Sequence, residues 1–448
     1  MLKFKLLPLS FFLLASALWG QQPLSLDQAL QEALRNNRSA QNADRDIEIA
    51  QKQRWETIAT GLPQISASAG YNKAIEQPTS LIPAGFFGGN PGEFAEIQFG
   101  TEQSVDAQAR VNQLVFDGSY LVGLQASKIF LTISKQAKIK TDLEVRRVVT
   151  DAYVNMLLAT EQVAVLSNNV ANVEKTLMET QKIADNGLVE EELVQQLRIT
   201  LSSLQSALDY SQRMVPVTKK MLNLVMGKPL ADPITPSDSL LGLCIKQTSS
   251  ENDAALDVEQ NIDYQIAQND QRSQELLLKL ERFRALPTIS AFASGGYDGY
   301  SDAFDFLERD QSWFGRASLG FSINLPIFSS GGRQARTQRA KINVDKAKTQ
   351  VEETEAQLML QWASLQNQYT LALENFKRSQ ENLTLAENIE EKNQIKFNEG
   401  IVGSFTLREA QTQLYQAQNE YLTSMQSVIQ ARTALDILLH TTPKNEKK

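Results

Sequence analysis

One phrase of this 448-residue chain occurs twice, and this repetition constrains the fold more than any other feature. Residues 61–72 read GLPQISASAGYN, and residues 285–297 read ALPTISAFASGGY, so that Leu62 corresponds to Leu286. Farther along, VNQLVFDG at 111–118 aligns with INLPIFSS at 323–330, at a smaller offset than that of the first phrase. The offset changes between the two phrases, where a surface loop of variable length is expected. The sequence therefore predicts two copies of one structural unit.

Apolar residues recur in alternating steps of three and four along a second repeated region. They follow this spacing through 149–215, with a turn in between, and again in the same phase through 362–428. Two polar residues, Ser379 and Glu390, weaken the second copy of the pattern. A strict three-four spacing is typical of coiled-coil packing rather than of the broader apolar face of a globular helix. Each half is therefore predicted to contain helices packed as a coiled coil.

Both halves are predicted to contain the same elements in the same order: a helix, a strand pair, a very long helix and a shorter helix. The boundaries expected for the first half, 21–226, are helix 24–60, strands 62–72 and 104–116, and helices 118–183 and 190–226. Those expected for the second half, 251–440, are helix 251–284, strands 286–297 and 315–328, and helices 330–396 and 404–439. A linker rich in Pro and Ser, 227–250, joins the halves, and 441–448 form a polar tail.

The predicted strands alternate between apolar and polar residues, as strands with one face of each kind do. An ordinary antiparallel sheet buries its apolar face, whereas a transmembrane barrel turns this face to lipid. Strands of about 9 to 13 residues are long enough to cross a bilayer at a tilt, but a sheet in a soluble protein also fits the pattern. On the membrane interpretation, the residues that face lipid include Ile65, Ala67, Ala69, Leu319, Phe321 and Ile323.

Four strands per chain are too few to close a barrel, because membrane barrels begin at about 8 strands. An open sheet edge is not tolerated in lipid, since its backbone groups would have no hydrogen-bond partners. If the strands span a membrane, several copies of the chain must therefore contribute, and three copies would supply twelve strands.

The N-terminal residues have the pattern of a secretory signal peptide. Lys3 and Lys5 precede an apolar run at 6–18, and small residues at 15–17 form a cleavage site, with Gly20-Gln21 as an alternative. Residues 1–20 are therefore expected to direct export from the cytoplasm. No later stretch has the roughly 18 consecutive apolar residues that a transmembrane helix needs.

The composition argues against several kinds of partner and chemistry. With 44 basic and 52 acidic residues, the chain lacks the positive charge that favours nucleic acid. Cys244 is the only cysteine and His440 the only histidine, which excludes an intrachain disulfide and a histidine-based metal site or catalytic triad. The glycine clusters at 85–92 and 295–299 lack the following lysine of a phosphate-binding loop. No catalytic residue, cofactor-binding residue or metal ligand is therefore expected.

The order of these elements and several short motifs resemble the TolC-like outer-membrane efflux protein family, over nearly all of the chain after residue 20. Each motif is loose, whereas the order of the elements and the duplication are specific. The motifs are LDQAL at 26–30 with Ala33-Leu34 and Asn37, the Leu-Pro strand entries at 62–63 and 286–287, LPIF at 325–328 with Gly331-Gly332, and the turns at Gly187 and Gly400.

The resemblance implies a mainly α-helical protein with transmembrane β-strands. Each chain would contribute a duplicated long-helix coiled coil and four membrane strands. Three identical chains would close as a twelve-stranded β-barrel in the outer membrane, continuous with a twelve-helix tunnel in the periplasm.

The implied function is that of a passive exit duct, without enzymatic activity, in a tripartite efflux or type I secretion system. Its location would be the outer membrane of a Gram-negative bacterium, with a long periplasmic extension. The implied partners are a periplasmic adaptor protein, an inner-membrane transporter and outer-membrane lipid, and no cofactor. The coiled-coil pattern alone leaves one alternative, a soluble periplasmic scaffold protein.

The resemblance also places the two glycine-centred turns at the periplasmic tip of the tunnel. The residues expected to contact the adaptor are Gly187, Leu188, Gly400 and Ile401. The residues expected at the entrance are Glu190, Glu191, Glu192, Leu193, Val402, Thr406 and Glu409. The family often carries acids at the positions of Thr406 and Glu409, and only the second is acidic here. Acidic residues also stabilise a helix N-terminus through the helix macrodipole, so this alternative stays open.

Overall fold

A computed structural model describes residues 23–88, 90, 92–187, 189–248 and 255–440. The expected signal peptide at 1–20, the polar tail at 441–448 and Leu188 lie outside the described residues. The chain is mainly helical and divides into two compact units. The first unit comprises 1–44, 137–262 and 355–448, and the second comprises 45–136 and 263–354. Each unit thus contains segments from both halves of the sequence.

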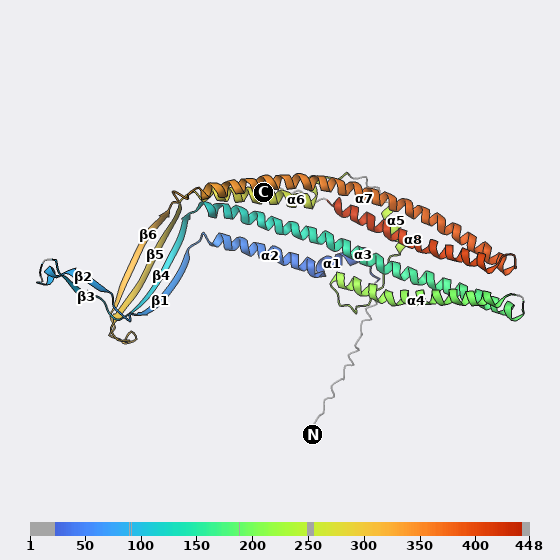
Figure 1. The fold of residues 1–448 in the computed structure, drawn as a ribbon, viewed down its shortest axis with the longest axis horizontal. Helices are drawn as coiled ribbons and strands as arrows, with labels where there is room; N and C mark the ends of the chain where they lie inside the picture. The colour runs from blue at the N-terminus through green and yellow to red at the C-terminus, as the bar shows by residue number, and fades with distance from the viewer. Residues whose placement is uncertain (1–22, 89, 91, 188, 249–254, 441–448) are drawn as a thin grey trace, which may run out of the picture. The chain divides into compact units, whose positions relative to one another are not determined.

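The second unit contains a four-stranded antiparallel sheet in the order β1-β4-β5-β6 (Figure 1). Its strands are β1 (Gln64–Lys73), β4 (Gln103–Phe116), β5 (Thr288–Ser301) and β6 (Trp313–Asn324). Between β1 and β4, where the sequence predicts a surface loop, lies a separate hairpin. It consists of β2 (Thr79–Pro83), the short 3₁₀ helix η1 (Ala84–Phe87) and β3 (Phe94–Gln98).

The register of the sheet aligns equivalent residues on all four strands. Ala67 of β1 pairs with Ala109 of β4, which pairs with Gly295 of β5, which pairs with Ala317 of β6. Because successive residues of a strand point to opposite faces, most apolar residues of the four strands share one face, whereas Phe292 and Phe314 lie on the other. The polar residues share the other, where the hydroxyl oxygens of Ser294 and Ser318 lie 2.7 Å apart.

Four helices enter or leave the sheet. They are α2 (Arg38–Ala59), α3 (Gly118–Asp185), α6 (Ile262–Phe283) and α7 (Gly332–Asn398). Two close approaches hold their ends in the second unit. The Tyr120 hydroxyl donates to the Ile58 carbonyl at 3.1 Å and lies against Gly61, where a Cβ would be 2.3 Å from the ring. The Asn269 amide of α6 donates to Gln136 of α3 at 2.6 Å.

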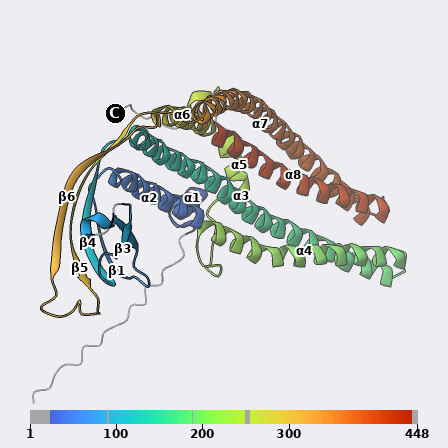
Figure 2. The same ribbon diagram turned by 60° about the vertical axis from the view of Figure 1, so that its left-hand side comes forward.

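The first unit is built from two helical hairpins, α3 with α4 (Glu191–Met226) and α7 with α8 (Ser404–Leu438), as Figure 2 shows. The shorter elements are α1 (Leu26–Asn36), α5 (Leu240–Thr248) and the 3₁₀ helix η2 (Val258–Gln260). The largest core joins α1, α3, α4, α5 and α8 around fully buried Tyr153, Met156 and Leu222. The seam positions Val170, Val173 and Leu204 form a second buried cluster between α3 and α4.

Two asparagines at equivalent positions of the two halves hold the ends of the hairpins in the same way. The Asn37 amide donates to the Val225 carbonyl of α4 at 2.7 Å, and the Asn261 amide donates to the Leu438 carbonyl of α8 at 3.0 Å. Val225 and Leu438 are also equivalent, because the repeated helical pattern aligns one with the other. The two halves of the sequence thus repeat an interaction as well as a motif.

The prediction of a single helix over 24–60 is wrong, because Asn37 divides this segment into α1 and α2. Its backbone is extended, with φ −61° and ψ 132°, and its side-chain oxygen accepts a hydrogen bond from the Ser39 N–H at 2.8 Å. Asn37 therefore ends α1 and caps α2. The linker at 227–250 also contains a helix, α5, whose buried residues include Leu240 and Cys244. Among the residues that the structure describes, no helix is apolar enough over sufficient length to cross a membrane.

Candidate functional site

The two hairpin turns each require a glycine with a left-handed backbone. Gly187 has φ of 72° and Gly400 has φ of 71°. At the second turn, the Ile401 N–H donates to the Lys396 carbonyl at 2.8 Å and the Gly400 N–H donates to the Phe397 carbonyl at 3.0 Å. This is a Schellman ending, which satisfies the last carbonyls of α7 and reverses the chain.

The acidic residues expected at the entrance surround the start of α4. Glu190 is the N-cap residue, but its side chain makes no capping hydrogen bond, and Glu191 and Glu192 occupy the first turn. All three are exposed, and Glu192 accepts a hydrogen bond from the Gln196 amide at 3.1 Å. Their position fits the macrodipole explanation and an acidic entrance equally well.

On the other hairpin, the expected residues differ in exposure. Thr406 and Glu409 are exposed in the first turns of α8, whereas Val402 in the turn is half-buried. Ile401 is 66% exposed at the end of the hairpin. An apolar side chain with that exposure is available for contact with another protein.

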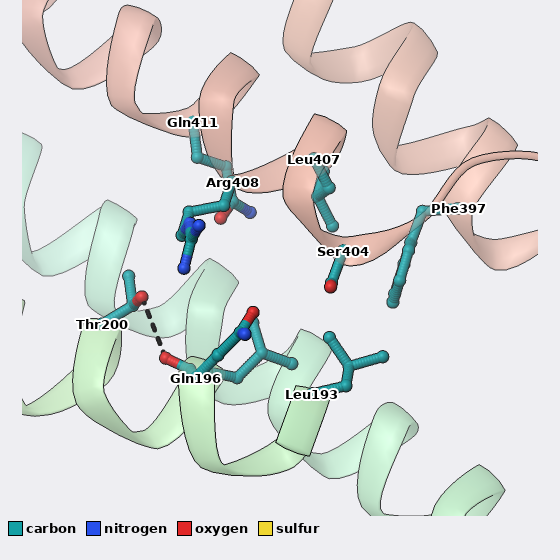
Figure 3. Close-up of a pocket in the computed structure, with 9 residues that line it drawn as sticks. Leu193, Gln196, Thr200, Phe397, Ser404, Leu407, Arg408 and Gln411 are labelled. Atoms are coloured by element: carbon teal, nitrogen blue, oxygen red, sulfur yellow. Dashed lines mark hydrogen bonds between the residues drawn. The ribbon is translucent and has the colours of Figure 1, made fainter. Parts of the chain in front are cut away.

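A small cavity lies between the two hairpins (Figure 3). It has a volume of about 10 Å³, which is room for about one water molecule, so it is not a ligand pocket. Of the residues expected at the entrance, only Leu193 lines it. Its walls are Leu193, Gln196, Leu197 and Thr200 of α4, Phe397 of α7, and Ser404, Leu407, Arg408 and Gln411 of α8.

Arg408 is the charged residue of this cavity, and no pattern in the sequence predicts its place there. Its side chain extends from α8 toward Gln196 and Thr200 of α4 in Figure 3. The guanidinium also lies 5.5 Å from the centre of the Phe405 ring. The helical pattern contains no signal for it, because its neighbours belong to the other half of the sequence.

Polar hydrogen bonds connect α3 with the second hairpin. The Gln426 amide of α8 donates to Asn155 at 2.6 Å, and the Asn169 amide donates to Gln418 of α8 at 2.8 Å. The largest apolar core also joins the hairpins, because it contains both Met156 of α3 and Ile429 of α8. Separating the hairpins would expose this core to water as well as break the amide hydrogen bonds. Apolar packing and amide hydrogen bonds therefore both hold the two hairpins together.

One carboxylate occupies a seam position between α7 and α8. Glu390 is half-buried and accepts a hydrogen bond from Gln411 of α8. Burial raises the pKa of Glu390 above its usual range, the Gln411 hydrogen bond lowers it, and the charge of Glu391 raises it further. Burial and then the charge of Glu390 raise the pKa of Tyr415 in α8 to about 12.

The apolar face of the strand sheet is open. Leu319 is 81% exposed, Phe321 73%, Ile323 68% and Ile65 76%, and Ala67 and Ala69 are also exposed. A sheet of a soluble protein would bury this face against other elements. The structure gives no support to the soluble scaffold interpretation. No group of His, Cys, Asp or Glu side chains that could hold a metal ion is found among the described residues.

Comparison with known proteins agrees with this architecture. A family model described as "Outer membrane efflux protein" matches residues 256–439. No curated protein is significantly similar to the chain.

Several solved structures share the fold over most of the chain, at low sequence identity. CusC is 17% identical, with a TM-score of 0.75 over 93% of this chain and 92% of its own. The outer membrane protein VceC of Vibrio cholerae is 16% identical, with a TM-score of 0.70 over 93% and 96%. The CmeC outer membrane channel of Campylobacter jejuni is 18% identical, with a TM-score of 0.71 over 92% and 85%.

The family model covers the second half of the sequence, and the shared fold extends through both halves. The chain is thus similar to the outer membrane efflux proteins, in sequence over residues 256–439 and in fold over both halves, which agrees with the resemblance of its motifs.

Proposed function

We propose that this chain forms the outer-membrane exit duct of a tripartite efflux or type I secretion system in a Gram-negative bacterium. The observation that carries the proposal is the four-stranded sheet. Its apolar face is uncovered, and in the described residues no strand pairs with the outer edge of β1 or of β6. A sheet with these properties is incomplete as a single chain in water or in lipid.

A homotrimer completes the sheet. If β6 of one chain pairs with β1 of the next, three chains form a closed twelve-stranded barrel without open edges. The apolar face then turns to outer-membrane lipid and the polar face lines a lumen. A barrel of this size is wider than the eight-stranded barrels whose interiors are filled by side chains, so it can conduct cargo.

The helices would continue the duct into the periplasm as a tunnel of twelve helices. At about 1.5 Å per residue, α3 and α7 are each about 100 Å long. The two turns would lie at the periplasmic tip, where Glu190, Glu191, Glu192 and Glu409 give the entrance negative charge. Leu193, Val402 and Thr406 complete the proposed entrance.

The tip turns would contact a periplasmic adaptor protein, which connects the duct to an inner-membrane transporter. Exposed Ile401 is an apolar residue available for this contact, and Leu188 would be its counterpart on the other hairpin. Gly400 sets the turn geometry that presents Ile401, and Gly187 has the same left-handed backbone in the other turn. In this role the chain conducts substrates passively and carries out no chemical reaction.

The trimer can be tested by placing cysteines on the two edge strands. Within one chain β4 and β5 separate β1 from β6, so the edge strands are about 14 Å apart, beyond the reach of a disulfide. Any disulfide between a cysteine in β1 and one in β6 must therefore join two chains. Native Cys244 does not interfere, because it is fully buried and burial raises its pKa to about 11.

The experiment combines Ala67→Cys in β1 with Ala317→Cys, Leu319→Cys or Phe321→Cys in β6, in protein extracted from outer membranes. At least one pair is expected to give oxidised species of two and three chains and none larger. Ala67→Cys alone is the control and should give no species of three chains. Only single chains with every pair, or a series that continues beyond three chains, contradicts the proposal.

A further inference from the structure

Arg110 on the polar face of the sheet lies over an aromatic ring rather than beside a carboxylate. Its guanidinium carbon is 4.5 Å from the centre of the Phe292 ring, and its Nε donates to Asn112 at 2.9 Å. Arg110 has no ion-pair partner among the residues that the structure describes. The terminal N–H groups of the guanidinium therefore remain available to another acceptor.

The Phe292 ring is held in place by the strand on its other side. Phe292 of β5 lies directly opposite Gly320 of β6. A Cβ at Gly320 would come within 3.0 Å of the ring, so the ring occupies the space that a side chain would need. Three neighbouring strands thus contribute to this site: the absence of a side chain at Gly320 leaves room for the Phe292 ring, and Arg110 lies over the ring.

The nearby acids do not neutralise this arginine. Asp298 forms an ion pair with Arg316, with Nε and the carboxylate oxygen 3.2 Å apart. Asp106 lies opposite Asp298 on the sheet. It is four residues from Arg110 along β4, which is about 13 Å in an extended strand. Along the strands, the polar face therefore has an acidic region around Asp106 and Asp298 and, about 13 Å away, the guanidinium of Arg110 without an ion-pair partner among the described residues.

We propose that the Arg110–Phe292 pair is a binding site for the anionic group of cargo, and that it prefers planar aromatic carboxylates. This inference rests on the proposed function, in which the polar face lines a lumen and three such pairs surround it. A carboxylate can accept charge-assisted hydrogen bonds from the free guanidinium N–H groups. The flat part of the ligand can then stack on the guanidinium or on the ring, as arginine and aromatic side chains permit.

The test is current block in planar bilayers by benzoate, with acetate as the carboxylate that lacks a ring. In the unaltered protein, benzoate should reduce the single-channel current at lower concentration than acetate. Arg110→Gln should weaken the benzoate block about tenfold, because the positive charge and the planar guanidinium with its paired donors are lost. Arg110→Lys keeps the charge without the planar group, and Phe292→Leu keeps the guanidinium without the ring. Both should retain block but lose the preference for benzoate over acetate.

The outcomes separate this inference from the function on which it rests. Suppose that the unaltered protein conducts. If benzoate then blocks the Arg110→Gln channel as strongly as the unaltered channel, or blocks neither channel, the proposed binding site is refuted and the proposed duct function is not. If the purified, unaltered protein does not conduct, the proposed function itself is wrong. The Arg110→Lys and Phe292→Leu variants keep the test decisive if Arg110→Gln fails to insert.

Discussion

Asn169 in α3 donates an amide hydrogen bond of 2.8 Å to Gln418 in α8, and this bond joins the two helical hairpins. Asn169 is only 4% exposed, so its amide depends on this partner while the hairpins are together. When the hairpins separate, water can satisfy both amides. The bond therefore contributes to the packing of the two hairpins against one another, beside the apolar core that they share.

Replacing Asn169 with alanine should loosen the contact between the hairpins. The loss of one hydrogen bond costs about 1 kcal/mol, which corresponds to about a fivefold increase in local opening. Amide hydrogen exchange measured by mass spectrometry should therefore accelerate by about that factor in the facing part of α8. Asn168→Ala is the matched control, because Asn168 is exposed on the same helix. Equal exchange in both variants would show that the bond does not hold the hairpins together.

Glu390 should make the α7–α8 hairpin more stable in acid than at neutral pH. Burial raises its folded pKa, so the folded hairpin retains this proton more strongly than the unfolded chain. This contribution is complete below the unfolded pKa of about 4.3 and is lost as the pH rises through the raised folded pKa. Asp151 and Asp436, whose pKa values are also raised by burial, act in the same direction.

The Glu390→Gln variant should accordingly have a melting temperature a few degrees higher at pH 7.5 and nearly unchanged at pH 4. Its stability should depend less on pH than that of the unaltered protein, but the dependence should persist because of the two aspartates. Glu387→Gln, at an exposed position three residues earlier on α7, controls for the loss of a charge. A variant that is destabilised equally at both pH values would refute the assignment of the pH effect to Glu390.

The acidic tip residues should make the duct prefer cations. Replacing Glu190, Glu191, Glu192 and Glu409 together with glutamine removes the charge without changing the size of the side chains. Reversal potentials in a salt gradient should then show reduced cation selectivity, and block by multivalent cations should weaken. Unchanged selectivity would mean that these acids serve the N-termini of their helices and not the entrance.

Gly400→Ala should destabilise the second hairpin turn by about 1 kcal/mol, because φ of 71° places a Cβ in a strained backbone conformation. Gly85→Ala is the control, since Gly85 does not have a left-handed backbone and a Cβ there would meet no atom within 4 Å. Thermal unfolding should show a lower melting temperature for the first variant only. Equal melting temperatures would indicate that the turn does not depend on its glycine.

The sequence predicted the parts of the fold that follow a regular period. The seam residues Val149, Val173 and Leu204 are buried, and the alternating residues of β6 separate onto two faces. Ser379 and Glu390 weakened the helical pattern, yet the structure pairs Ser379 with Ser424, whose hydroxyl oxygens lie 2.7 Å apart, and Glu390 with Gln411. A period identifies the buried positions but not the polar partners that make a polar residue acceptable there.

Features that depend on contacts between distant segments could not be predicted in this way. The amide of Asn37, at the break, donates to the Val225 carbonyl of α4, and the cavity that Arg408 lines is formed in part by α4. The Arg110–Phe292 pair requires the register of β4 against β5, which alternation alone does not determine. The entrance residues followed from the turns, but their exposure depends on how the two hairpins pack.

Single-channel recording from the purified chain in planar lipid bilayers tests the central claim most directly. The protein is extracted from outer membranes in detergent and added to one side of a bilayer in a simple salt solution. A trimeric duct predicts discrete, uniform current steps after insertion. Complete absence of current steps, from protein that remains folded and inserts into the bilayer, would contradict the claim that this chain forms an exit channel.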